Sequence, residues 1–157
     1  MSESDSYLIF NSARLQNLYY KLPLNLDHII QKKRHALCGL KESIAQNLHL
    51  IISTYRGESA FSDDFGCSLW DEEFNLQFDL QWKENLYESL AHTISKFEKR
   101  FKLNDLRANM EEHTETLGKD KLRVRRRLKI EIAGVIRKTN ESFNFSDFIF
   151  ISPLAQK

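Results

Sequence analysis

The side chains best suited to acid–base chemistry are carboxylates in the middle of the chain. Glu58, Asp63, Asp64 and Glu98 are the candidates. Glycoside hydrolysis needs two carboxylates on either side of a sugar cleft, one of them with a raised pKa. However, Asp63 and Asp64 precede Phe-Gly in a stretch typical of a turn, and the sequence marks no cleft. We therefore predict no catalytic residue, and a cell-wall hydrolase stays an alternative.

Metal-binding and cofactor motifs are missing from the sequence. Metal sites need clustered ligands, whereas the five histidines form no helical pair and have no cysteine neighbour: His28, His35, His49, His92 and His113. No phosphate-binding glycine loop or nucleophile motif occurs. We expect neither metal nor cofactor. Cys38 and Cys67 are isolated, which fits a reducing cytoplasm, although a bridge between them stays open.

The most prominent charged feature is the basic stretch 121–129. Apolar residues alternate there with Arg123, Arg125 and Arg127, which predicts a half-buried strand with these arginines on one solvent-facing side. Acidic residues of the preceding strand could pair across this face: Glu111, Glu112 and Glu115. A paired or solvated face, a face for a protein partner and a nucleic-acid-binding face stay open. The third is least favoured because no exposed aromatic ladder is expected for base stacking.

Two amphipathic helices are expected to position these groups. Apolar residues at steps of three and four predict one helix over 40–55 and another over 82–101. Gly57 should end the first helix at positive φ, and Phe61 and Phe65 in the following loop should both dock onto the core. The buried stripe of the second helix comprises Leu86, Leu90, Ile94, Phe97 and Phe101. The connection 57–80 should be anchored by Trp70, Phe74, Leu76, Phe78 and Leu80.

The apolar period then changes from about four to two. This change predicts strands over 106–116, 121–136 and 143–151, joined by turns at 118–120 and 139–142. The predicted fold is α+β: an antiparallel β-meander of about three strands packed against two main helices, with an N-terminal arm. We place the arm at residues 1–37, with disorder over 1–6 and a helix over 13–22, and the α+β domain at 38–157.

The composition fits an ordinary soluble domain. The chain has 157 residues, 41% hydrophobic and 29% charged, with a net charge of +1. A near-neutral charge argues against general affinity for nucleic acid or acidic lipid. No apolar run is long enough to cross a bilayer, and the polar start is not a signal peptide. We expect a cytoplasmic protein without membrane insertion.

Three blocks of the sequence resemble the baseplate-wedge family of contractile injection machines. The first is SI-x-x-NL-x-L-I-x-S-x-x-x-GE from Ser43, continued by F-x-x-x-FG-C-x-x-W from Phe61. The second is the helix ending at Glu98-Lys99-Arg100, and the third is the C-terminal strands. This family includes the phage wedge protein once named a tail lysozyme, and TssE of type VI secretion. The resemblance covers about 38–151.

The resemblance implies a non-enzymatic structural role. A TssE-like protein links the baseplate wedge to the sheath and templates sheath assembly. The implied partners are TssF-, TssG- and TssK-like wedge proteins and a TssB/TssC-like sheath. In the family, a Glu-Pro-Arg tripeptide contacts the other wedge subunits. Glu98 and Arg100 match it, whereas Lys99 replaces the proline.

Spacing sets a condition on this motif. Residues two apart on a helix point in nearly opposite directions, so Glu98 and Arg100 can share a partner only if the helix ends near Lys99. Because fold stability should come from the apolar stripe of the helix, we expect Arg100→Ala to leave the isolated chain folded.

Overall fold

The computed structural model describes residues 18–70, 80–117 and 121–151. The chain divides into two compact units, residues 1–47 and 48–157. Each unit is described by itself.

The first unit contains a small antiparallel strand pair and a short helix. Strand β1 (Tyr19–Tyr20) pairs with β2 (Leu37–Cys38), and between them lies helix α2 (Leu26–Ile30). The helix predicted over 13–22 is wrong in its described part, because Tyr19 and Tyr20 form a strand. Helix α3 (Leu40–Ser53) begins in this unit and continues into the second.

Both main helices exist, and both end earlier than predicted. Helix α3 ends at Ser53 instead of residue 55, and helix α4 (Leu80–Phe97) ends four residues before Phe101. Phe101 is buried, as expected, but it is the first residue of strand β3 (Phe101–Leu117) and not the last of the helix.

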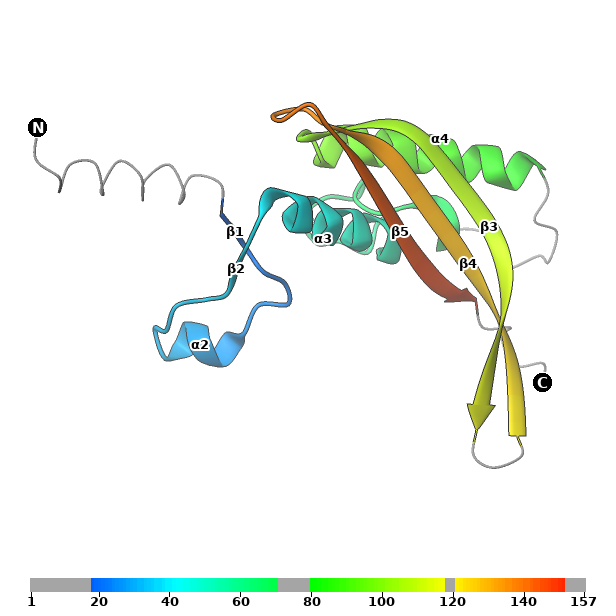
Figure 1. The fold of residues 1–157 in the computed structure, drawn as a ribbon, viewed down its shortest axis with the longest axis horizontal. Coiled ribbons are helices and arrows are strands. Elements are labelled where there is room, and N and C mark those ends of the chain that lie inside the picture. The colour runs from blue at the N-terminus through cyan, green and yellow to red at the C-terminus, as the bar shows by residue number, and fades with distance from the viewer. Residues whose placement is uncertain (1–17, 71–79, 118–120, 152–157) are drawn as a thin grey trace, which may run out of the picture. The chain divides into compact units, whose positions relative to one another are not determined.

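Strands β3, β4 (Lys121–Ile136) and β5 (Glu141–Ile151) form one antiparallel sheet in the order β3-β4-β5. The α+β meander is thus confirmed, although β3 begins five residues before the predicted start. Figure 1 shows α4 lying along one face of this twisted sheet. β5 pairs with β4 only from Arg126 onward, so the β3–β4 hairpin extends beyond the end of β5.

The core of the second unit lies between the sheet and the helices. Strand β4 buries its even-numbered apolar residues, Leu128, Ile130, Ile132 and Ile136. Helix α4 buries Leu86, Leu90 and Ile94, as predicted. The last part of α3 is tied to β5 by His49, whose Nδ1 lies 2.5 Å from Oδ2 of Asp147.

The loop after α3 contains two glycines at positive φ and one phenylalanine, Phe65, that packs against a helix residue. Gly57 has φ 85°, which confirms the predicted positive φ. Phe65 packs edge-on against Phe97 with ring centroids 5.2 Å apart. Phe61 does not dock: its side chain is fully exposed, so that expectation is wrong. The predicted anchors at 74, 76 and 78 lie outside the described residues, as do the side chains of Trp70 and Leu80.

The two loop glycines should differ in their tolerance of alanine. A Cβ on Gly57 would meet nothing within 4 Å, so Gly57→Ala should cost only the strain of positive φ, about 1 kcal/mol. At Gly66 (φ 106°) a Cβ would lie 2.6 Å from the carbonyl oxygen of Thr54. Gly66→Ala should therefore cost about 3 kcal/mol, because backbone must move as well. Urea unfolding of both variants measures this difference, and equal costs would contradict it.

Candidate partner-binding site

The Glu98-Lys99-Arg100 motif forms the turn between α4 and β3. The Glu98 N–H still donates to Ile94 O at 2.8 Å, and Phe101 N then donates to Glu98 O at 3.2 Å. The carbonyl of Arg100 accepts from Arg137 N at 2.8 Å, which fixes the turn to the end of β4. The helix thus ends just before the motif, so Glu98 and Arg100 are not held on opposite sides of a helix.

Glu98 and Arg100 bond to each other. Oε1 of Glu98 accepts from the Arg100 backbone N–H at 3.1 Å and from Nε at 2.8 Å, while Oε2 accepts from the second guanidinium nitrogen. Glu98 is 1% exposed, whereas the Arg100 side chain is 32% exposed. The buried carboxylate therefore positions the arginine fork, and Arg100 and the exposed Lys99 are the parts of the motif that reach the surface.

This geometry changes the expectation for Arg100→Ala. Removing the arginine takes away much of the positive charge and hydrogen bonding that compensate the buried carboxylate of Glu98. Such a loss is strongly destabilising. Arg100 thus has a structural role in addition to the partner contact that we predict for it.

Arg125 and Arg127 lie on the face of β4 opposite its buried even-numbered residues. Arg127 donates to Oε2 of Glu111 on β3 from Nε at 3.1 Å and from the second guanidinium nitrogen at 2.9 Å. The predicted cross-strand pairing is confirmed for these two residues. Arg125 lies opposite His113 in the register, and the side chain of Arg123 lies outside the described residues. Contact of these arginines with a partner stays a prediction.

Two phenylalanines of β5 share this outer face. Phe148 and Phe150 are 40% and 44% exposed, and the guanidinium of Arg127 lies 4.2 Å from the ring centroid of Phe148. Two exposed aromatic residues therefore lie beside the basic strand, although no exposed aromatic ladder was expected there. The sequence contained a signal for these exposed rings. Side chains alternate along a strand, so if residues 143 and 145 face the core, the even-numbered residues of β5 must face outward.

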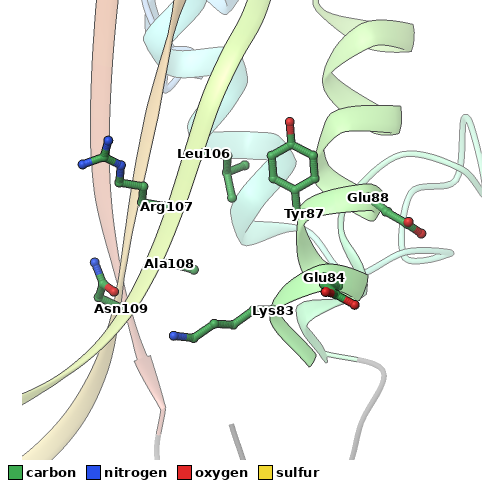
Figure 2. Close-up of a pocket in the computed structure, with 8 residues that line it drawn as sticks. All are labelled: Lys83, Glu84, Tyr87, Glu88, Leu106, Arg107, Ala108 and Asn109. Carbon is green, nitrogen blue, oxygen red and sulfur yellow. The ribbon is translucent and has the colours of Figure 1, made fainter. Parts of the chain in front are cut away.

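A hollow of about 430 Å³ lies between α4 and β3. Figure 2 shows Lys83, Tyr87, Leu106 and Ala108 facing the gap, whereas Glu84 and Glu88 point away from β3. Both glutamates that line the hollow come from α4, and the lining residues from β3 include no carboxylate, so no two carboxylates face each other across the gap as glycoside hydrolysis requires.

Three of the four carboxylates considered for hydrolysis make other contacts: Glu58, Asp64 and Glu98. Glu58 accepts from Tyr55 N at 3.0 Å, and Asp64 lies 2.5 Å from Nζ of Lys96. The hydrogen bond and charge of Lys96 lower the pKa of Asp64, which is the reverse of what a general acid needs.

Among the described residues, no group of histidine, cysteine and acidic side chains could hold a metal ion. Cys38 and Cys67 are buried thiols, and no described helix could cross a membrane.

The family model of the baseplate wedge protein gp25 matches residues 38–141, from the end of β2 to the start of β5. The chain belongs to this family. The match includes the Glu98–Arg100 turn and all of β3 and β4. The protein is therefore a baseplate wedge gp25-like structural component of a contractile tail or injection system.

One solved structure supports the same fold. It is a crystal structure of a protein from Geobacter sulfurreducens, provisionally named a tail lysozyme. The two chains are 22% identical with a TM-score of 0.59, over 78% of this chain and 100% of the other. No curated protein sequence gives a significant match.

Proposed function

We propose that this chain links the baseplate wedge to the first ring of the sheath in a type VI secretion-like machine and templates sheath assembly there. It would act in the bacterial cytoplasm as a TssE-like adaptor without catalytic activity. Its partners would be TssF-, TssG- and TssK-like wedge proteins and a TssB/TssC-like sheath.

The observation that carries the proposal is the family match across the Glu98–Arg100 turn and the sheet. At the turn, a guanidinium fixed on a buried carboxylate presents a preorganised charge to another subunit. In the sheet, β5 pairs with β4 alone among the described strands. An edge strand of this kind can accept a strand from a sheath subunit, which gives main-chain affinity without a pocket.

Deletion of the gene and reconstitution test the function together. A strain lacking the chain should assemble no sheaths labelled with a fluorescent sheath subunit, and the wild-type gene should restore them. In vitro, the chain should co-elute with co-expressed TssF- and TssG-like proteins from the same organism. Normal sheaths in the deletion strain, together with no co-elution, would refute the proposal.

A cell-wall hydrolase is the first alternative, and the name of the Geobacter sulfurreducens protein suggests it again. We expect no release of label from dye-labelled peptidoglycan. Turnover that Glu98→Gln abolishes, and that the matched exposed change Glu84→Gln preserves, would establish the enzyme instead.

A nucleic-acid-binding module is the second alternative, favoured by Phe148 and Phe150 beside the basic strand. Bases can stack on exposed aromatic residues flanked by cations. However, Arg127 is already paired with Glu111, and Lys129 lies 2.8 Å from Glu131, so this face is largely neutralised. We expect negligible binding of labelled single strands at low salt. Binding that depends on salt, with a slope that falls by about one in Arg125→Ala, would contradict this.

A further inference from the structure

The segment from Leu18 to Leu37 contains more than half of the large apolar side chains that are exposed in the described residues. Of fourteen large apolar side chains exposed in the described residues, eight lie in this segment. They are Leu18, Tyr20, Leu22, Leu24, Leu26, Ile29, Ile30 and Leu37. Helix α2 buries none of its residues, and Ile30 is 78% exposed. Clustered exposed apolar side chains mark interaction sites.

The backbone of this segment is nevertheless held in place. Lys21 N donates to Ala36 O at 2.9 Å, and a ring nitrogen of His35 lies 3.1 Å from Lys21 O, which closes the loop at its base. Leu22 N donates to the side-chain oxygen of Gln46 at 2.8 Å. Asn25 caps α2 by accepting from His28 N at 3.1 Å. An isolated five-residue helix is not stable in water, so these bonds keep an apolar surface presented to solvent.

The same loop forms a hollow of about 930 Å³ with a distinctive lining. One part is apolar and comprises Tyr20, Leu24, Ile29 and Leu37; the other is the basic run 32–35, Lys-Lys-Arg-His. The loop contains one acidic residue, Asp27. Lys21, the remaining cation, is paired with Glu42 at 2.9 Å. An occupant complementary to this lining must bring apolar side chains and negative charge together.

We infer that the hollow between α2 and the β1–β2 pair is a docking site for an acidic, amphipathic segment of a partner protein. Apolar side chains of the partner would cover Ile29 and Leu37, and its carboxylates would pair with Lys33 and Arg34. The family match begins at residue 38, so this surface lies outside the matched wedge domain. The inference goes beyond the proposed function, and each can fail without the other.

The inference can be tested by phage display. Peptides are selected from a random library with the full-length chain as bait. Enriched peptides should combine apolar residues with a net negative charge. The affinity of a selected peptide should fall about tenfold or more in Ile29→Ser and in Lys33→Glu. The matched changes Leu50→Ser and Lys138→Glu, which alter exposed residues outside this loop, should leave it unchanged. Circular dichroism of each variant establishes that the fold persists.

Four results would overturn the inference. These are no enrichment, enrichment of cationic peptides, binding that is unaffected by Ile29→Ser and Lys33→Glu, or a concentration-dependent dimer that Ile29→Ser dissolves. The last would assign the surface to a second copy of the chain. The first result, no enrichment, would assign the surface to a membrane if the chain then binds phosphatidylserine vesicles.

Discussion

Arg100→Ala should abolish sheath assembly and should also destabilise the isolated chain by about 2 kcal/mol. The fork of Arg100 compensates Glu98, which is 1% exposed, and removal of the fork leaves a buried charge that has lost much of this compensation. The loss should be smaller than for a fully buried pair, because the arginine side chain is 32% exposed. Urea unfolding measures the first effect, and fluorescent sheath counts in cells measure the second.

Two further variants separate the structural role of Arg100 from its predicted partner contact. Glu98→Gln combined with Arg100→Ala removes the buried charge as well as the arginine, so stability should partly recover while assembly stays lost. Arg100→Lys keeps the charge but loses the bidentate geometry, and it should weaken co-elution with wedge proteins. If the double variant assembles sheaths normally, Arg100 contacts no partner, and the motif has only a structural role.

Sequence patterns predicted the fold well wherever the apolar period was regular. The alternation in β4 predicted both of its ends, at residues 121 and 136, and steps of three and four located the buried faces of both helices. Ion pairing was predictable in part, since Glu111 and Arg127 meet as cross-strand neighbours. Local periodicity is reliable here because each residue faces either the core or solvent.

The region 97–105 was misread for two physical reasons. Phe101 follows Phe97 by four residues, so it continues the helical stripe although it starts a strand. A register shift between Leu103 and Asp105 then breaks the period of two, so that inward-facing residues run 101, 103, 106 and 108. This irregularity concealed the first five residues of β3, and with them the true end of α4.

The contacts within the candidate site were less predictable than the fold. A spacing of two suggested that Glu98 and Arg100 point apart, and only the end of the helix at Phe97 lets them bond. Phe61 shows the same limit in a loop, where sequence cannot tell which of two aromatic residues packs. Burial of a loop residue depends on tertiary neighbours, which local patterns do not encode.

Gly134→Val should cost about 3 kcal/mol or more and prevent normal packing of the sheet. Gly134, like Arg126, is an exception in the alternation of β4, and the space on the inward side of Gly134 is occupied by neighbouring atoms. A Cβ there would lie 2.2 Å from the carbonyl oxygen of Lys102 and 2.3 Å from the ring of Phe101. Phe101 is 1% exposed and packs edge-on against Phe143 with ring centroids 5.9 Å apart. Any side chain at 134 must therefore displace both backbone and a core ring, which is among the costliest kinds of substitution.

The matched control is Ala133→Val, the neighbouring position on the outer face of the same strand. That face is partly solvated, and β-branched residues suit strands, so this change should cost less than about 0.5 kcal/mol. Urea unfolding compares the two, and near-ultraviolet circular dichroism reports the packing of Phe101 and its aromatic neighbours. Equal stability of the two variants would mean that β3 and β4 can separate at little cost where Gly134 approaches Phe101 and Lys102. In that case the close approach of Gly134 to Phe101 does not hold the start of β3 against the core.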